Sequence, residues 1–525
     1  MAIIGGGSSG LCAAKYAFES GFQPVIFEKS AHFGGVWSPI GQVWSQMHTN
    51  VGSYLSSFAD FPWPPQSPLF PSSGDVFNYL LAYAEKFDLL KHVRFNAEVI
   101  KIEQPSNDDD NDKWQITLSD QSVESFDYCV ISTGFNSRPI LPQYPNQAAF
   151  KGKILHANDY DSNDEELKGK RVVVVGCAFS AIEIVTDLVG HASHVLNLFR
   201  RPYLIFPKII RTKCGDDDEQ NNVKVRPIDT FFFNRHCYYD ILSKRDQESL
   251  EEKRKLFKQL SPIQTDPKSS PPSLFIDLDD SSSQDSYFKT NNKMAISEDY
   301  MRYLSEERIE TMRGEIEEFK ANGIVVNDTF IEADCVLFCT SYGIETKFFD
   351  AQTLEKLHFD SSNPLNPLVL YNVTWPHQLG HNLAFCGLFR GSNFLTAELQ
   401  AKWIFKVFSG ALQLPDESVM RAAIEQDVEK RRQNPHAQYP YPGILVSDRI
   451  AREFGAMPDL EAMKERDPTL YGYLWRGPFL PQHFLLNDVN GRQFALSEIE
   501  RINERLERDY SLDEAKNISI QNFKY

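Results

Sequence analysis

The chain has 525 residues, 42% of them apolar, and its 54 Lys plus Arg against 72 Asp plus Glu give a formal net charge of −18. A chain of this length suggests about two to four domains and can bury large cores without disulfides or structural metals. The negative charge argues against a general binder of nucleic acids or of anionic membranes, because both repel an acidic surface.

The chain begins with alternating strand and helix patterns. We expect a short strand at Ala2–Ile4, a helix over Leu11–Glu19 and a second strand at Pro24–Phe27. This alternation is typical of βαβ units and a parallel sheet, so the predicted class is α/β. No basic segment with a long apolar core precedes the first strand, and no run of about 18 apolar residues occurs in the chain. We therefore expect neither a secretory signal nor a membrane anchor.

A glycine-rich motif joins the first strand to the first helix. It reads Gly5-Gly6-Gly7-Ser8-Ser9-Gly10. In the G-x-G-x-x-G pattern the first glycine permits a tight turn, the second lets a pyrophosphate approach the backbone, and the third lets helix and strand pack closely. Glu28 ends the second strand, where a carboxylate accepts hydrogen bonds from a ribose. The motif predicts a dinucleotide site; the alternative is a surface glycine turn.

A hairpin is predicted after this unit. The residues Glu98–Ile102 and Trp114–Leu118 have strand-like patterns, and the polar loop Ser106–Asp112 lies between them. Two short strands around a loop rich in Asn and Asp are typical of a hairpin with an exposed turn.

A second strand–turn–helix unit starts with the strand Arg171–Val175 and continues through Gly176. Ala178 and Ala181 stand where a G-x-G-x-x-G motif has its second and third glycines. Alanine is common at the third position, whereas at the second it narrows the space for the phosphates. The unit therefore predicts a second dinucleotide site with an altered turn.

Two arginines, Arg200 and Arg201, follow the next strand, Val195–Phe199. A carboxylate at this place would favour a free ribose 2′-hydroxyl, whereas arginines suit a 2′-phosphate. The pair favours NADPH over NADH; the alternative is a plain βα unit with two solvated arginines. An acid-bearing first site and an arginine-bearing second site together suggest FAD first and NADPH second.

The segment Ser261–Asp285, rich in Ser, Pro and Asp, is predicted to be a mobile surface insertion, since its composition buries too little apolar surface to offset chain ordering. A charged helix, Gln247–Gln259, precedes it, and the apolar run Cys335–Cys339 predicts a buried strand further on. The eight cysteines form no C-x-x-C pair and no zinc-type cluster, which predicts reduced buried thiols, no metal site and a reducing, cytoplasmic location.

Phe150, Gly152, His156 and Tyr160 fit the pattern F-x-G-x-x-x-H-x-x-x-Y shortly before the second glycine turn. On this motif the chain resembles the flavin-containing monooxygenases, class B flavoproteins that oxygenate soft nitrogen and sulfur nucleophiles. The related Baeyer–Villiger enzymes carry Trp where this chain has Tyr160. Further family-like segments are Gly34-Gly35-Val36-Trp37, Thr49-Asn50, Asp60–Pro64, Ser132-Thr133-Gly134, Cys339–Tyr342, Glu398–Trp403, Asp448–Ala451, Asp467-Pro468 and Gly477-Pro478.

Two positions depart from the family pattern. Ser341 stands where the second T-G link between the domains normally has glycine, and Ala178 where the NADPH loop normally has glycine. Both bear on the geometry of the NADPH site. The polar C-terminus lacks the apolar anchoring tail of the animal microsomal members, which fits the expectation of a soluble protein.

The resemblance implies two Rossmann-like domains, with the NADPH domain inserted into the FAD domain. Residues 1–155 would form the first part of the FAD domain, and residues 156–329 the NADPH domain, with an insertion near 213–290. Residues 330–525 would form the rest of the FAD domain and the C-terminal region on the substrate side. The implied reaction is that of a dimethylaniline N-oxide-forming enzyme: NADPH reduces FAD, O2 gives a C4a-hydroperoxyflavin, and a soft N- or S-nucleophile takes the distal oxygen.

The resemblance assigns one catalytic side chain, Asn50, whose amide would donate to the peroxide or hold NADP; otherwise it is a turn asparagine. His156 is expected to orient the interdomain turn rather than to transfer a proton. Glu398 and Gln400 would otherwise be helix-surface residues, and Gln400 is counted as a cofactor contact. The expected cofactor-binding residues are Gly5, Gly6, Gly7, Ser8, Ser9, Gly10, Glu28, Gly35, Val36, Trp37, Thr49, Asn50, Val51, Val99, Thr133, Gly134, Gly176, Ser180, Ala181, Arg200, Arg201 and Gln400.

Other interpretations stay open. A Baeyer–Villiger or N-hydroxylating monooxygenase is the nearest, and Ala178 and Ser341 would suit a non-catalytic, nucleotide-binding regulatory flavoprotein. A pyridine-nucleotide disulfide reductase needs a redox-active cysteine pair that the sequence lacks. The expected partners are a small N- or S-containing substrate and O2. The sequence identifies neither the substrate nor the oligomeric state, and a homodimer stays open.

Overall fold

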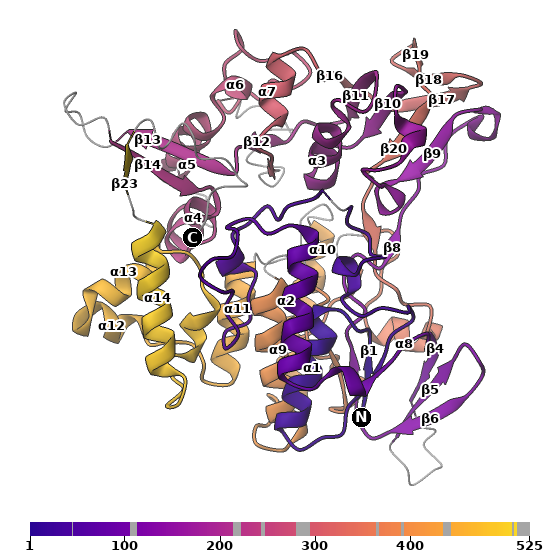
Figure 1. The fold of residues 1–525 in the computed structure, drawn as a ribbon. Coiled ribbons are helices and arrows are strands. Elements are labelled where there is room, and N and C mark those ends of the chain that lie inside the picture. The colour runs from indigo at the N-terminus through magenta and orange to yellow at the C-terminus, as the bar shows by residue number, and fades with distance from the viewer. Residues whose placement is uncertain are drawn as a thin grey trace.

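The computed structural model describes the chain apart from residues 45, 105–112, 214–221, 243–246, 280–293, 364–366, 390–392, 434–442, 507–508 and 512–525. The described part confirms the α/β prediction. Two separate five-stranded parallel sheets form its centre, one above the other in Figure 1. Helices and smaller antiparallel sheets surround them.

The first sheet contains the predicted N-terminal unit. Its strands, in spatial order, are β22 (Leu383–Phe385), β7 (Cys129–Ile131), β1 (Ala2–Ile4), β2 (Val25–Phe27) and β3 (Val93–Arg94), and all neighbours pair in parallel. Helix α1 (Ser8–Glu19) packs against α9 (Asn393–Phe408) beside this sheet, as Figure 1 shows. Every residue of β1 and β7 is buried, as expected for a sheet covered on both faces.

The second sheet contains the other predicted unit. Its strands, in spatial order, are β16 (Glu310–Arg313), β11 (His194–Phe199), β10 (Arg171–Val175), β20 (Cys335–Phe338) and β9 (Lys153–His156), and all neighbours pair in parallel. Helix α3 (Phe179–Leu188) follows β10. The continuous valine run of β10 buries its central residues, which explains why it reads as a strand covered on both faces.

The chain crosses between the sheets at a two-stranded ribbon, β8 (Arg138–Pro139) with β21 (Tyr342–Gly343). The second sheet takes its strands from residues 153–338 alone, and the first takes strands from both sides of that range. This is the pattern of one domain inserted into another. The expected boundary at 155 falls within β9, and the one at 329 falls at the start of β19 (Thr329–Glu332). The boundaries stay predictions.

Antiparallel sheets extend each layer. The predicted hairpin is confirmed by β4 (Val99–Glu103), β5 (Trp114–Leu118) and β6 (Val123–Phe126), although its turn lies outside the described residues. A similar sheet of β17 (Ile316–Lys320), β18 (Gly323–Val326) and β19 lies beside the second sheet. The other elements outside the insertion and the C-terminal part are η1 (Gly35–Trp37), η2 (Ser53–Leu55), α2 (Ser73–Lys86), η3 (Leu90–His92), η4 (Gln147–Ala149), η5 (Ala157–Asp159), η6 (Glu165–Leu167), α7 (Tyr300–Ser305) and α8 (Ala351–Lys356).

The inserted segment is more ordered than its composition predicts. Its elements are β12 (Leu204–Phe206), β13 (Ile209–Lys213), β14 (Asn222–Pro227), α4 (Asp229–Phe232), η7 (His236–Leu242), α5 (Gln247–Leu260), α6 (Pro262–Thr265) and β15 (Met294–Ile296). The prediction of a mobile Ser261–Asp285 is wrong for residues 261–279. Leu274 is buried in one hydrophobic cluster, whereas Ile276 and Leu278 are buried in another. Single apolar residues spaced along the polar stretch therefore reach two cores. Residues 280–285 lie outside the described part.

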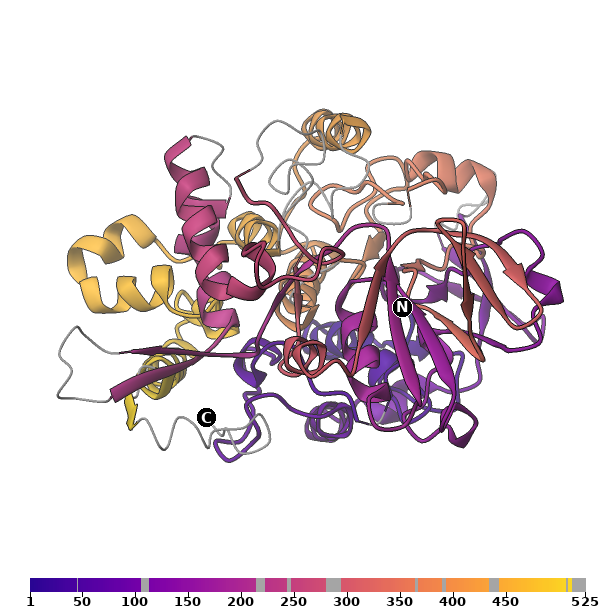
Figure 2. The same ribbon diagram turned by 90° about the horizontal axis from the view of Figure 1, so that it is seen from above.

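The C-terminal part of the chain is mainly helical, and some of its elements contact the inserted segment. Its elements are α10 (Glu417–Gln433), α11 (Gly443–Glu453), α12 (Leu460–Arg466), α13 (Pro468–Arg476), η8 (Pro481–Leu485) and α14 (Arg492–Leu506), and β23 (Asp509–Ser511) ends the described chain. Strand β23 pairs with β14, and α13 and α14 contact η7 and β14. Figure 2 shows the β13–β14 hairpin extending to the left beside these yellow helices.

Candidate functional site

The first glycine turn leaves the amino end of α1 open. Gly5 has a φ of 106°, which glycine adopts without strain. A Cβ on Gly10 would lie 1.9 Å from the carbonyl oxygen of Gly5, so strand and helix can approach this closely only with glycine there. No side chain caps α1, and its first turn carries no acidic residue. The first-turn N–H groups, which a helix leaves without internal partners, therefore fit a pyrophosphate.

Glu28 follows β2 and is buried beside this turn. Its Oε2 accepts a hydrogen bond from the Gly6 N–H at 2.8 Å, and its Oε1 accepts from the N–H and hydroxyl of Ser30 at 2.9 Å. The Ala97 N–H donates to the Glu28 carbonyl, which brings the start of β4, with Val99, close to the same strand end. The carboxylate is thus fixed at the place where a ribose is expected.

The G-G-x-W turn lies directly on the first glycine turn. The Gly34 N–H donates to the Gly6 carbonyl at 2.8 Å, and a Cβ on Gly7 would lie 3.6 Å from the Cα of Gly35. Val36 and Trp37 follow in η1, where Trp37 packs partly buried against the first core. The structure therefore brings together two motifs that lie about 30 residues apart in the sequence.

Asn50 lies in the loop that precedes η2, and its side chain has an unsatisfied hydrogen-bonding group. The Asn50 Oδ1 is buried and accepts no hydrogen bond. Thr49 holds the loop, because its N–H donates to Pro71 and its hydroxyl donates to the Val51 carbonyl at 2.8 Å. An unpaired buried amide oxygen costs about 1–3 kcal/mol, so this atom fits a donor supplied by a bound group.

Thr133 and Gly134 follow β7, the neighbour of β1. The Ser132 N–H donates to Ile4, and a Cβ on Gly5 would lie 2.5 Å from the Ser132 carbonyl oxygen. This places the first T-G link against the first glycine turn. The Thr133 hydroxyl is buried without a hydrogen-bond partner, and the space above Gly134, whose φ is 75°, is open to 4 Å. Both features leave room for a bound dinucleotide.

The second glycine turn joins β10 to α3 in the same way. Gly176 has a φ of 136°, and Ala178 begins the helix with φ −88° and ψ −177°, an extended conformation that any residue adopts. Ala181 is buried and fits against Gly176. Helix α3 also has no side-chain cap and no acidic residue in its first turn, which includes Ser180. The amino end of α3 therefore also fits phosphates, and the Cβ of Ala178 lies at the start of that helix.

Arg200 and Arg201 lie just after β11, on the strand next to β10, and both are exposed. Among the described residues, Arg200 forms an ion pair with Glu315 at 3.7 Å, and both side chains are largely exposed. Such a loose surface pair contributes little to stability. The Arg200 guanidinium is therefore available to a phosphate near the second turn.

Glu398 and Gln400 are buried rather than on the helix surface. The amide of Gln400 donates to the Val373 carbonyl at 2.9 Å, and its Oε1 accepts from the Gly387 N–H at 2.9 Å. A Cβ on Gly387 would lie 2.4 Å from the Ser9 side chain. Gln400 thus supports the backbone that covers the start of α1. A direct cofactor contact would need its amide to exchange these partners.

Glu398 links three segments of the first domain. Its carboxylate accepts from the Tyr16 hydroxyl at 2.8 Å and from the Ala59 N–H at 2.7 Å, and Lys402 lies at 2.9 Å. The Asp60–Pro64 motif begins at this junction, where Asp60 pairs with the buried Lys15. The Asp60–Pro64 segment and the Glu398–Trp403 segment therefore stabilise the packing of the first domain. The alternative prediction, that Glu398 and Gln400 lie on the helix surface, is wrong because both side chains are buried.

His156 is buried and held from both ring nitrogens. Its Nδ1 accepts from the Asn158 N–H at 3.1 Å, which leaves Nε2 to donate to the Ser341 carbonyl at 3.2 Å. Burial lowers the pKa of His156, so the neutral ring is favoured. Ser341 itself has a φ of 86°, a conformation that suits glycine. These contacts agree with an orienting role for His156 at the interdomain turn.

Two charged residues near the Asn50 loop are buried, and no local sequence pattern predicts their burial. Lys208 is 2% exposed, and its ammonium lies 3.4 Å from the His48 carbonyl and 3.6 Å from Glu183. Asp229 is fully buried. Charged residues in loops and at the starts of helices normally face solvent, so only the tertiary contacts reveal these two.

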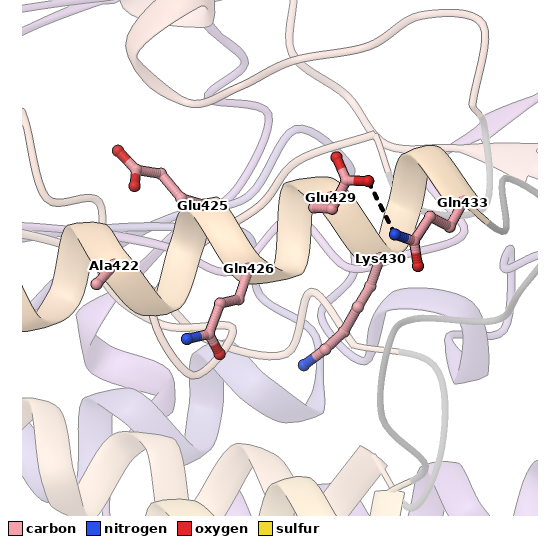
Figure 3. A pocket seen from close by; sticks show the side chains of 6 residues that line it. All are labelled: Ala422, Glu425, Gln426, Glu429, Lys430 and Gln433. Carbon is pink, nitrogen blue, oxygen red and sulfur yellow. Dashed lines mark hydrogen bonds between the residues drawn. The ribbon is translucent and has the colours of Figure 1, made fainter.

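A surface hollow of about 520 Å³ lies away from both glycine turns. The residues that line it are Ala422, Glu425, Gln426, Glu429, Lys430 and Gln433 (Figure 3). All of them belong to α10, and Glu429 accepts from the Gln433 amide at 2.8 Å. A hollow on one helix face with no residue from the glycine turns is not a dinucleotide site.

Two negative findings concern the described residues. No group of three or more His, Cys, Asp or Glu side chains among them could hold a metal ion. None of the described helices is both long enough and apolar enough to span a membrane.

Comparison with known proteins identifies relatives along most of the chain. A family model described as flavin-binding monooxygenase-like matches residues 1–213 and 287–520. The chain is 29% identical over 522 residues to flavin-containing monooxygenase 1 of Rattus norvegicus, covering 93% of this chain and 88% of the relative. It is 26% identical over 516 residues to 4-hydroxybenzoate brominase (decarboxylating) of Pseudoalteromonas luteoviolacea (strain 2ta16), covering 95% and 92%. The S-allyl-L-cysteine S-oxygenase structure from Allium sativum matches with a TM-score of 0.59 and 18% identity, covering 95% and 98%.

Proposed function

This chain belongs to the flavin-binding monooxygenase-like family, and on that premise we propose that it is an NADPH- and O2-dependent monooxygenase acting on soft nitrogen or sulfur nucleophiles. The observation that carries the proposal is the pair of anion-ready glycine turns on two separate parallel sheets. The first has a ribose carboxylate, Glu28, and the second has the exposed arginines Arg200 and Arg201. A flavin site at the first turn and an NADPH site at the second turn account for both sets of residues.

FAD would lie against the first turn. The amino end of α1 would hold the pyrophosphate, Glu28 would accept from the ribose, and the Gly35–Trp37 turn would contact the flavin side. The unpaired Thr133 hydroxyl supports this position. When bound, FAD supplies the oxygen chemistry, and the protein supplies binding, orientation and exclusion of water.

NADPH would lie against the second turn. The amino end of α3, with Ser180 and Ala181, would hold the pyrophosphate, and Arg200 with Arg201 would bind the 2′-phosphate. The extended backbone of Ala178 supports this proposal. Alanine in place of glycine narrows the space for the phosphates there, but it causes no backbone strain. The alanine does not by itself favour a regulatory protein without turnover.

Asn50 is the proposed catalytic side chain, between the flavin and the nicotinamide. Its unpaired Oδ1 would accept a hydrogen bond from bound cofactor, and its NH2 would donate toward the reacting oxygen. In Asn50→Asp the donor is lost and a negative charge is added. FAD should stay bound, while most of the NADPH consumed should yield hydrogen peroxide. Unchanged product yield per NADPH in this variant would remove the role from Asn50.

The substrate class is the part that family membership leaves open, since the relatives include a brominase by name as well as oxygenases. The test is turnover with isotopically labelled O2 and three probes: an aryl methyl thioether, a tertiary amine and a cyclic ketone. We expect label in the S-oxide or N-oxide and little lactone. Lactone as the main product would favour the Baeyer–Villiger alternative.

A cytoplasmic location and a homodimer remain proposals from the sequence. The seven described cysteines are all free, and six of them are buried, which supports a reducing compartment. Size-exclusion chromatography with light scattering tests the assembly, and fractionation of the expressing cells tests the location.

A further inference from the structure

A carboxylate of the inserted segment reaches the loop that carries Asn50. Asp229, the first residue of α4, is fully buried. It accepts a hydrogen bond from the Gly52 N–H at 2.5 Å and another from the Tyr54 hydroxyl. These donors lie two and four residues after Asn50. Asp229 also lies between residues 213 and 287, in the stretch that the family model does not match.

Other contacts of this loop are mostly made by its backbone, beside the Thr49 contacts described above. On one side the Ser53 N–H donates to Leu69 at 2.7 Å. On the other side of Asn50, the Lys208 ammonium lies 3.4 Å from the His48 carbonyl, a long and weak contact. The two bonds to Asp229 restrain the stretch directly after Asn50 from the inserted segment.

Asp229 is itself held rigidly. The Ile228 N–H donates to Lys208 at 2.9 Å, and the Phe233 N–H donates to the Asp229 carbonyl at 2.7 Å. Arg235, two residues after Phe233, forms a fully buried ion pair with Asp448 of α11 at 2.8 Å. A carboxylate on such a support can fix the geometry of a neighbouring loop.

Burial raises the pKa of Asp229 to about 6, while the hydrogen bonds from Tyr54 and Gly52 act in the opposite direction. At neutral pH the group is therefore ionised and accepts both bonds. A hydrogen bond to a charged acceptor contributes more than a neutral one, so the loop is most firmly held in this state.

We propose that Asp229 is a positioning residue, which fixes the Gly52–Tyr54 segment and thereby the orientation of the Asn50 amide. The catalytic part of this inference rests on the proposed function, and the structural part rests only on the contacts of Asp229 with Gly52 and Tyr54. The inserted segment thus contributes to the site without touching the reacting atoms.

The test combines a structural and a catalytic measurement on the FAD-loaded full chain. Hydrogen–deuterium exchange is followed on peptides that cover residues 48–55, and hydrogen peroxide is measured per NADPH consumed. The variants are Asp229→Ala, Tyr54→Phe and, as a matched control, Asp240→Asn. Asp240 belongs to the same inserted segment, but it accepts hydrogen bonds from His236 and Trp475.

We expect exchange over residues 48–55 to rise about tenfold or more in Asp229→Ala, and by a smaller factor in Tyr54→Phe. The fraction of NADPH lost as peroxide should rise in the same order, and Asp240→Asn should match the wild type. Unchanged exchange and unchanged peroxide in folded Asp229→Ala would overturn the proposal. If Asp229→Ala does not fold, unchanged exchange and unchanged peroxide in Tyr54→Phe would overturn the proposal. If the wild type does not oxidise NADPH at all, the proposed function fails, and exchange alone still decides the structural part.

Discussion

The two glycine turns of this molecule have the same backbone path and different side chains. Gly7 and Ala178, the second positions, have nearly equal angles: φ −76° with ψ −174°, and φ −88° with ψ −177°. Gly5 and Gly176, the first positions, both have positive φ. Only the first position therefore needs glycine for its conformation, and the second needs it only for the space that a phosphate would use.

The third positions differ for a steric reason. A Cβ on Gly10 would lie 1.9 Å from the Gly5 carbonyl oxygen, whereas Ala181 carries a Cβ and packs against Gly176. Helix α1 thus approaches its strand more closely than α3 does. A degraded motif can therefore keep its backbone path when the lost glycines are those that provide space rather than backbone freedom.

The largest expected effect comes from Gly10→Ala. The added methyl group would overlap the Gly5 carbonyl, so helix and strand must separate. We expect a loss on the order of 4 kcal/mol or more in the free energy of unfolding, together with loss of FAD. Calorimetry and the flavin content of the purified protein measure both. The matched substitution in the other turn, Ala181→Gly, should retain FAD; equal damage in both turns would contradict the steric account.

The next largest effect is expected from Arg200→Ala combined with Arg201→Ala. Charge-assisted bonds to a phosphate contribute about 1.5–3 kcal/mol, so KM for NADPH should rise roughly tenfold to a hundredfold. KM for NADH should change little, because NADH has no 2′-phosphate. Steady-state kinetics with both nucleotides gives the answer, and parallel changes for the two would argue that the arginines do not read the 2′-phosphate.

Restoring the missing glycine should have a moderate effect. Ala178→Gly removes a Cβ beside the amino end of α3, and KM for NADPH should fall a few-fold, since about 0.8 kcal/mol, the contribution of one methylene group, is roughly a fourfold change. The mirror substitution, Gly7→Ala, should weaken FAD binding by a similar or larger factor. A rise in KM for NADPH in Ala178→Gly would mean that the alanine contributes a contact rather than an obstacle.

The smallest effect concerns the two links between the domains. Ser341 has a φ of 86° where Gly134, in the first link, has 75°. Ser341→Gly should relieve left-handed strain and stabilise the protein by up to about 1 kcal/mol. Chemical denaturation measures the change. Gly134→Ala is the control, since its Cβ would meet no atom within 4 Å and only the conformational cost, of similar size and opposite sign, should appear.

The sequence predicts the parts of this molecule that depend on local patterns. Strand β1, helix α1, the β4–β5 hairpin and the valine run of β10 all follow from short-range periodicity and turn residues. Both glycine turns, Glu28 and the arginines follow from motif spacing. Their meeting at the ends of parallel strands then follows from the fold class.

The remaining features depend on contacts between distant segments. The helix pattern places Glu398 on the surface, yet it accepts hydrogen bonds from Tyr16 and Ala59 at the other end of the chain. Leu274 is one apolar residue in a polar stretch, and its burial depends on where that stretch packs. Asp229 reaches Gly52 across 177 residues. No local pattern contains such information, because the partner determines the role.

The most direct test of the central claim, two dinucleotides acting in one chain, is anaerobic mixing of the FAD-loaded protein with NADPH. The account predicts bleaching of the visible flavin absorbance by NADPH and much slower bleaching by an equal concentration of NADH. Readmission of O2 with a thioether should then restore the absorbance and give about one S-oxide per flavin. Absence of bleaching with NADPH would contradict the claim.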